Sequence, residues 1–441
     1  MLVSFSFGNY KSFKDENTIS LVAEIADANN EYSVSTPFGY SVLKTAAVYG
    51  ANASGKSKLF DAMAFFRSVV RPPQNAKKIP VFDFWKNKYD AFRLSTKSVE
   101  KSSFFEVVFI LDEIQYRYGL ELNAKGILEE WLYRKNERET LILSRIVDED
   151  GSLKMKIGKT FINAKVYANV VGAGMVSADV PLLTILATFN DTLSKEIVNW
   201  FGQMKIISAN ELVAPIEALM EENSKKEIIN FMRAFDFNIE DFAMHEISPE
   251  SIPEKMKSII GEEALKGPVY DGVSTTHRLY NELYEKVGTR QFMMEVDESF
   301  GTNRLFRLSW SILRALKEGY TLLIDEIDSG LHPFIVSTII SLFYQTNNRA
   351  QLIVNTQNSS LLAYPIGYED NNKDKKYLFR KDQIYIVNKN RYGESNVYPI
   401  THFQRNIRTS LEKMYLDGKF TGVPYVELDN ILDLIGHESQ G

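Results

Sequence analysis

The stretch GANASGKS, residues 50 to 57, constrains the fold more than any other part of the chain. It fits the pattern G-x-x-x-x-G-K-[ST], it follows the apolar run LKTAAVY, and a segment with apolar residues at helical spacing comes after it. A strand, a glycine-containing turn and a helix in this order direct backbone N–H groups and the positive end of the helix toward one point, which favours a phosphate group there. The sequence therefore predicts an α/β fold built around a nucleotide-binding loop.

The residues of this loop have distinct predicted roles toward ATP and Mg²⁺, the expected cofactors. Lys56 is expected to reach the β- and γ-phosphates, and Ser57 to hold Mg²⁺ through its hydroxyl. The predicted nucleotide contacts in the loop are Gly50, Asn52, Ser54, Gly55, Lys56, Ser57 and Lys58.

A pair of adjacent acids lies far downstream, at the end of the run YTLLIDE. The apolar residues predict a buried strand, and carboxylates at the end of such a strand are costly unless a cation or hydrogen bonds offset their charge. We expect Asp325 to hold Mg²⁺ together with Ser57, and Glu326 to polarise the attacking water. The alternative is an ordinary surface turn, because DEIDSG is turn-like.

A third motif, ESFGTNRLF, precedes the acid pair at residues 298 to 306. Ser299 offers a hydroxyl, Gly301 allows close approach of the backbone, and Thr302 leads into a predicted helix whose positive end faces the same way. These residues are further predicted nucleotide contacts. The same Ser-x-Gly-Thr turn is also a plain helix N-cap, so both interpretations stay open at this level.

The remaining patterns predict mixed α and β structure. The runs SSFFEVVFIL and IQYRYGLEL, separated by Asp-Glu, predict a β-hairpin. From about residue 160 to 270 the sequence pattern predicts medium-length helices without coiled-coil heptads. FMMEVDES is predicted as a strand. Strands and helices alternate around YTLLIDE and QLIVNT, which predicts a parallel sheet.

Length and composition fit a large soluble domain with an insert, or two domains. A net charge of −6 gives no bulk attraction to nucleic acid or to an anionic membrane, and no apolar run approaches the roughly 20 residues of a membrane span. The absence of cysteine excludes disulfides and thiolate catalysis, and it fits a cytoplasmic location. We expect an N-terminal half with the loop and hairpin at 1–160, a helical insert at 161–290 and a C-terminal half at 291–441.

The motifs in this order resemble the ABC-type ATPases, which bind ATP between two copies. Several segments together resemble a branch of the bacterial AAA/ABC-type ATPases related to the OLD family, many of them found in antiphage defence systems. The segments that carry this resemblance are FSFGNYKSF, GANASGKS, QYRYGLEL with EEWLY after it, ESFGTNRLF, LLIDEIDSGLHP, RKDQIYIV and LEKMYLDGKFTGVPYV.

The resemblance implies an ABC-type P-loop ATPase head, with a mixed or parallel sheet, an antiparallel β-subdomain and an α-helical insert. It implies a homodimer or higher homo-oligomer in which Ser299 and Gly301 of one copy complete the ATP site of the other. It also implies a sensor or regulator in an abortive-infection-like antiphage system, acting on a separate effector protein such as a nuclease. Nucleic acid stays open as a further partner.

One position departs from the family pattern. Members usually carry Thr-His after the strand that follows the acid pair, whereas this chain reads IVNTQNSSLL and places Gln357 there. Gln can hydrogen-bond a phosphate, but it cannot carry the positive charge of a protonated His. Gln357 completes the predicted catalytic set with Glu326 and Lys56, and slow or tightly gated hydrolysis is expected. The alternative is a register shifted by one residue, with Gln357 as a plain loop residue.

The stretch after Gln357 is short for a Toprim nuclease domain, and Glu427, Asp429 and Asp433 are spaced like exposed positions of a helix. The expected effector is therefore a separate protein. Rival functions are a DNA-repair or chromosome-associated ATPase that acts on DNA directly, and a nucleotide-gated scaffold with little hydrolysis. The basic stretch NNKDKKYLFRK is interpreted as a solvated surface together with Arg405, Arg408 and Lys413, with nucleic acid or an acidic partner as alternatives.

Overall fold

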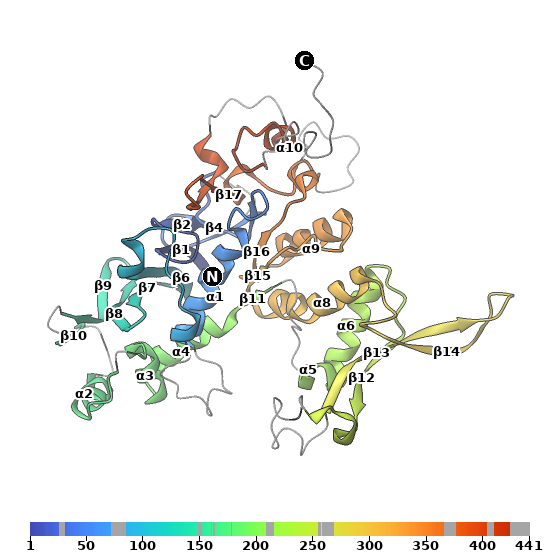
Figure 1. Ribbon diagram of the computed structural model, residues 1–441, viewed down its shortest axis with the longest axis horizontal. Coiled ribbons are helices and arrows are strands. Elements are labelled where there is room, and N and C mark those ends of the chain that lie inside the picture. The colour runs from blue at the N-terminus through green and yellow to red at the C-terminus, as the bar shows by residue number, and fades with distance from the viewer. Residues whose placement is uncertain are drawn as a thin grey trace.

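The computed structural model describes most of the chain, and Figure 1 shows its elements arranged around a central sheet. None of the helices within the described ranges is long and apolar enough to cross a membrane. The described residues are 1–25, 31–71, 85–148, 152–159, 161, 164–177, 179–208, 216–254, 257, 269–365, 376–403 and 410–423.

The central sheet has six strands and positions the candidate site. Its order is β11 (Met204–Ile207), β15 (Thr321–Ile324), β16 (Gln351–Asn355), β5 (Thr45–Tyr49), β17 (Ile384–Lys389) and β18 (Ser395–Pro399). Neighbouring strands from β11 to β17 run parallel, and β18 pairs antiparallel with β17. The strands β5, β15 and β16 are buried at every position, as expected for strands covered on both faces.

A second sheet of seven antiparallel strands forms the β-subdomain. Its order is β10 (Leu153–Ile157), β9 (Glu139–Val147), β8 (Gly126–Lys135), β7 (Ile114–Asn123), β6 (Ser103–Leu111), β1 (Leu2–Gly8) and β2 (Asn17–Ser20). The predicted hairpin is the pair β6 and β7, whose turn residues Asp112 and Glu113 have positive φ angles. A separate two-stranded ladder joins β3 (Ser33–Ser35) to β4 (Ser41–Leu43).

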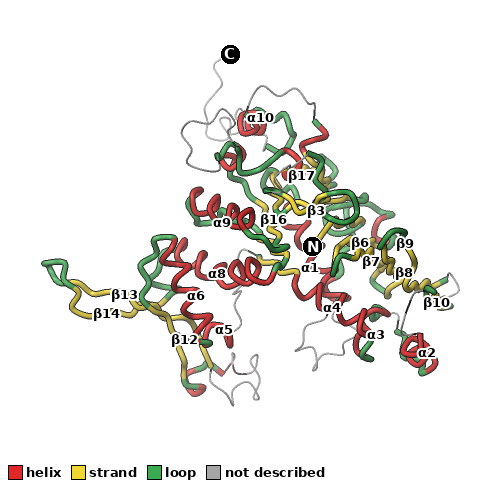
Figure 2. Tube along the Cα trace, turned by 180° about the vertical axis from the view of Figure 1, so that it is seen from behind, coloured by secondary structure: helices red, strands yellow, loops and turns green. Residues whose placement is uncertain are grey.

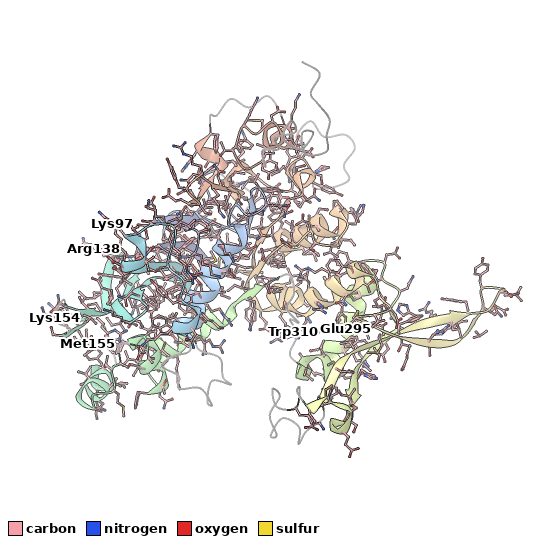
Figure 3. All side chains as sticks on the ribbon, in the orientation of Figure 1. Lys97, Arg138, Lys154, Met155, Glu295 and Trp310 are labelled. Carbon is pink, nitrogen blue, oxygen red and sulfur yellow. The ribbon has the colours of Figure 1, made fainter. Side chains whose placement is uncertain are left out.

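Helices cover both faces of the central sheet (Figure 2). On one face, α1 (Lys56–Val70) lies against the β-subdomain, and Phe66 of α1 stacks on Phe105 of β6 with 5.8 Å between ring centroids. On the other face lie α8 (Phe300–Glu318) and α9 (Pro333–Gln345). Figure 3 shows Lys154 of β10 at the left edge and Trp310 of α8 to the right of it, near the middle of the view. The predicted α/β class, with a parallel sheet and an antiparallel β-subdomain, is confirmed.

The stretch 161–290 contains the predicted helices and also strands that were not predicted. Its helices are α2 (Ala164–Gly172), α3 (Leu182–Thr188), α4 (Thr192–Gln203), α5 (Ile216–Met220) and α6 (Glu222–Ala234). The strand β11 joins the central sheet, while β12 (Asp241–Ile247), β13 (Val269–Tyr280) and β14 (Lys286–Met293) form a sheet of their own, whose β13–β14 end projects from the body (Figure 1). The predicted strand FMMEVDES ends early, in a turn. The strands β12 to β14 were not predicted because few of their positions are buried, so they lack a regular apolar face.

Candidate nucleotide-binding site

A cavity of about 480 Å³ lies beside the loop of residues 50–57, at the carboxyl edge of the central sheet. The loop joins β5 to α1 and the acid pair follows β15, so both reach this edge. The cavity is lined by Ser12, Asn52, Ala53, Ser54, Gly55, Lys56, Ser57, Lys58, Glu326, Gln357 and Lys389. The structure thus brings the loop, Glu326 and Gln357 together. It adds Ser12, which lies in the segment FSFGNYKSF without a predicted site role, and Lys389, which no sequence motif marks.

Two glycines of the loop occupy positions that a larger residue could not. Gly50 has a φ of 154°, and a Cβ atom there would lie 2.3 Å from the carbonyl oxygen of Val387. Gly55, the N-cap of α1, has a φ of 116°, and its Cβ would lie 2.6 Å from Ser395 Oγ. Ala53 also has a positive φ, of 61°. Such a backbone turns successive N–H groups inward, as in an anion-binding nest.

Lys56 and Ser54 present polar atoms that suit a phosphate group. Lys56 is 6% exposed, and its Nζ donates to the carbonyl oxygens of Gly50 at 2.6 Å and Ala51 at 3.0 Å. Burial lowers the pKa of Lys56, and acids that include Glu326 oppose this shift. Ser54 Oγ is buried and has no hydrogen-bond partner among the described residues. A phosphate oxygen would accept hydrogen bonds from both side chains, so the residues present fit a nucleotide.

Ser57 and Asp325, the predicted Mg²⁺ ligands, are in direct contact. Ser57 Oγ donates to Asp325 Oδ1 at 3.1 Å, and Asn355 Nδ2 donates to the same carboxylate oxygen. A hydroxyl and a carboxylate oxygen this close suit a small hard cation such as Mg²⁺. Elsewhere in the described part of the chain, no group of three or more His, Cys, Asp or Glu side chains is arranged for a metal ion.

Glu326 has a left-handed backbone conformation, with a φ of 51°. Its N–H donates to Asn355 Oδ1 at 2.6 Å, and the residue lines the cavity. Asn355 therefore contacts both acids of the pair. Sequence reasoning missed it, because its only signal is a polar residue at the end of the apolar run QLIVN.

The Ser-x-Gly-Thr turn, residues 299–302, opens α8, and we call it the signature turn. Ser299 is the N-cap of α8, and its Oγ accepts from the N–H of Thr302 at 3.1 Å. Gly301 lies against the neighbouring turn, where a Cβ atom would be 2.6 Å from the carbonyl oxygen of Gly330. The signature turn does not line the cavity of its own chain.

Gln357 lines the cavity opposite the loop, and its side chain is exposed. Its N–H donates to Asp328 Oδ2 at 3.3 Å, so the turn after the acid pair fixes the backbone of Gln357. Its position in the cavity lining makes Gln357 a candidate phosphate contact. The amide group can donate a hydrogen bond there without adding positive charge.

Part of the basic stretch NNKDKKYLFRK lies outside the described residues, as do Arg405, Arg408, Glu427, Asp429 and Asp433. In the described part, Lys376 pairs with Glu31 at 2.8 Å, and Arg380 pairs with the buried Asp382. Lys413 lies in α10 (Leu411–Leu416). The exposed Lys376 agrees with the predicted solvated surface, whereas Arg380 is mostly buried and does not.

A family model described as "AAA domain, putative AbiEii toxin, Type IV TA system" matches residues 46–161 and 208–363, more than half of the chain. Among solved structures, the chain is similar to an SMC head domain from Thermotoga maritima, at 13% identity over 90% of this chain and 98% of that chain, with a TM-score of 0.37. It is also similar to an SmcHead bound to the C-winged helix domain of ScpA, at 16% identity over 93% and 99% of the two chains, with a TM-score of 0.37. A Pyrococcus furiosus Smc head domain with an extended coiled coil, bound to the C-terminal domain of ScpA, has 16% identity over 95% and 99%, with a TM-score of 0.32. No curated protein matches the chain in sequence.

Proposed function

Because the chain belongs to the family of AAA domains described as putative AbiEii toxin, Type IV TA system, we propose that it binds ATP with Mg²⁺ and hydrolyses it slowly. The observation that carries this proposal is the meeting of Lys56, Ser57, Asp325 and Glu326 at the carboxyl edge of the central sheet. These side chains supply the positive charge, the metal ligands and the base that phosphoryl transfer to water requires.

Each residue would act on a different part of the reaction. Lys56 would leave the loop carbonyls and bind the β- and γ-phosphate oxygens. Ser57 and Asp325 would hold Mg²⁺, which supplies neutralisation of phosphate charge when bound. Glu326 would accept a hydrogen bond from the attacking water and orient it. Gln357 would donate a neutral hydrogen bond, and the missing positive charge is the reason for the slow turnover that we expect.

The proposed active form is a head-to-head dimer with ATP between two copies. Ser299, Gly301 and Thr302 do not line the cavity of their own chain, and Ser299 is exposed, so the turn could meet a nucleotide bound by a second copy. Thr302 is buried and hydrogen-bonds Ser299, so it would support the turn. The N-terminus of α8 contributes a partial positive charge at that point. Phe300, beside them, is 66% exposed, and covering it would add apolar area to such an interface.

We infer a role in antiphage defence, in which the ATPase senses infection or restrains a separate effector protein such as a nuclease. The support is the resemblance to OLD-related ATPases together with the family description. The head halves at 1–160 and 291–441 would bind ATP, and the insert at 161–290 would contact the trigger or the effector. A cytoplasmic location belongs to the same proposal. Nucleic acid remains a candidate trigger.

The test compares the wild type with Glu326→Gln. We expect the variant to lose ATP turnover and to double its light-scattering mass in Mg²⁺–ATP, because ATP that is not hydrolysed would keep two heads together. A mass that ATP does not change would contradict the sandwich, and unchanged turnover would contradict the role of Glu326. Turnover stimulated by DNA, with steep salt dependence, would favour the DNA-acting alternative.

A nucleotide-gated scaffold is the second candidate, and Gln357 at the usual His position favours it. In that case binding alone switches the protein, and Glu326→Gln would keep phage protection in cells. If ATP hydrolysis is required, the same variant loses protection.

A further inference from the structure

Arg304 connects α8, the helix that opens at the signature turn, to the backbone of the acid pair. Arg304 is 2% exposed, and its Nη2 donates to the carbonyl oxygens of Asp325 at 2.8 Å and Glu326 at 3.2 Å. A guanidinium group stays protonated even when buried, so both bonds are charge-assisted. One side chain of α8 thus holds the chain segment that carries both predicted catalytic and metal-binding acids.

Glu326 needs such support because of its backbone. With a φ of 51° it occupies the left-handed region, which is unfavourable for a residue with a Cβ atom and persists only where the surroundings fix it. Asn355 Oδ1 holds the N–H of Glu326 from one side, and Arg304 holds the C=O from the other. Without the second contact, the backbone can relax to an extended or right-handed conformation and carry the carboxylate away from the cavity.

The same helix carries the signature turn at its start. Ser299 caps α8, and Arg304 follows little more than one helical turn later. A helix of 19 residues moves as a rigid body, so a displacement of the signature turn also displaces the guanidinium group. The route from the signature turn to Glu326 therefore passes through one helix and one side chain.

We propose that Arg304 is a positioning residue: it holds the backbone conformation of Glu326, and this conformation changes when α8 moves. The inference rests on the proposed function, because it concerns the carboxylate that would orient the attacking water. In a dimer, the signature turn of each chain would contact the nucleotide bound by the partner, whereas its Glu326 would lie at the nucleotide bound by the same chain. Contact of the signature turn with the partner's nucleotide then adjusts the carboxylate in the other ATP site, so that the two sites hydrolyse cooperatively.

The test uses the full chain with Arg304→Gln and Arg304→Lys. The control is Arg307→Gln, since Arg307 Nε bonds Asn303 Oδ1 within the same helix at 2.5 Å. Readouts are kcat and KM for ATP, the Kd of a fluorescent ATP analogue, and hydrogen exchange of residues 325–327 without nucleotide. We expect Arg304→Gln to lower kcat about 10- to 100-fold while Kd changes less than about threefold, because a small displacement of a catalytic group slows the reaction more than it weakens binding.

Exchange of the Glu326 N–H should become faster in Arg304→Gln, the Hill coefficient for ATP should fall toward one, and Arg304→Lys should be intermediate. Arg307→Gln should behave as the wild type. Wild-type kcat in Arg304→Gln would overturn the proposal, and so would a loss of affinity in step with kcat. If Arg304→Gln does not fold, the decision rests on Arg304→Lys. Wild-type kcat in Arg304→Lys would then overturn the proposal. If the wild type itself hydrolyses no ATP, the proposed function fails, while exchange at residues 325–327 still tests the backbone contact.

Discussion

Two residues with left-handed backbones, Glu326 at the nucleotide edge and Tyr284 in the β13–β14 turn, stand in opposite surroundings. Glu326 has a φ of 51° and is held by Asn355 and Arg304 from two different elements. Tyr284 has a φ of 60° and is 89% exposed, and hydrogen bonds within the turn itself, between Asn281 and Leu283, Tyr284 and Glu285, hold the backbone around it. At the nucleotide edge the strained residue is the proposed catalytic carboxylate, whereas at the tip of β13–β14 it presents an aromatic ring to solvent.

The contacts around these residues differ in the same way. At the nucleotide edge, partly buried hydrogen bonds join the loop, β15, β16 and α8. In the β12–β14 sheet, the side-chain contacts include surface ion pairs, such as those of Glu240 with Arg278 and Lys286. Exposed ion pairs contribute little to stability, so we expect this sheet to open locally at lower free energy than the central sheet. The difference separates a region that must hold its geometry from one that can adapt to a partner.

The largest expected effect is that of Lys56→Ala. The variant removes the Lys side chain whose Nζ bonds the loop carbonyls, and with it the charge that would face the β- and γ-phosphates. We expect ATP turnover to fall by ~100-fold or more. Turnover in the presence of Mg²⁺ and binding of a fluorescent ATP analogue would measure it. Turnover near the wild-type level would show that this loop is not the reacting site.

A pair of glycine substitutions compares the two regions directly. Gly50→Ala places a Cβ atom against the Val387 carbonyl at a φ of 154°, and we expect it to lower the free energy of unfolding by about 2–4 kcal/mol. Gly288→Ala in β14 meets no atom within 4 Å, and we expect a change within about 0.5 kcal/mol. Urea denaturation of both variants gives the values. Equal losses would contradict the contrast between a tightly packed loop and an open strand.

The nucleotide edge could be predicted largely from sequence because its chemistry requires fixed residue types at fixed spacing. Gly50, Gly55 and Lys56 fall within one short motif, since one backbone turn must surround the phosphates. The acid pair was predictable because it ends a largely apolar run, which forms the fully buried strand β15. These features are local, so a single segment contains the whole signal.

The supporting contacts could not be predicted, because folding brings together residues that are far apart in the chain. Arg304 and Asn355 look like ordinary polar residues of a helix and a strand end, and only the packing of α8 against β15 and the pairing of β15 with β16 bring them to the acid pair. The strands of the β12–β14 sheet could not be predicted for another reason. Its strands bury few side chains, so the alternation that marks a strand is absent from the sequence.

Gln357→His tests whether a missing positive charge limits turnover. His can carry the charge that Gln cannot, and Gln357 lines the cavity beside Glu326. We expect turnover to rise about 3- to 10-fold, equivalent to about 1 kcal/mol of transition-state stabilisation. The gain should be larger at pH 6 than at pH 8, because the imidazole is protonated in the acidic range. If the variant is no faster than the wild type at either pH, the missing charge does not limit turnover. Domain closure would then be the next candidate for the rate-limiting step.

The smallest expected effect, and the closest test of the opening contrast, is that of Tyr284→Gly. Glycine adopts a φ of 60° without the clash of a Cβ atom, and Tyr284 buries little surface that would be lost. We expect the variant to stabilise the β13–β14 hairpin by about 0.5 kcal/mol, after the entropy cost of glycine is subtracted, and to leave ATP turnover unchanged. Hydrogen exchange of the β13 and β14 amides measures this local free energy.

Leu283→Gly is the matched control, because Leu283 is also exposed but has no positive φ, so the same substitution there should weaken the hairpin. If both glycine variants weaken it equally, Tyr284 carries no relievable strain, and its exposed ring would instead contribute packing to the hairpin itself.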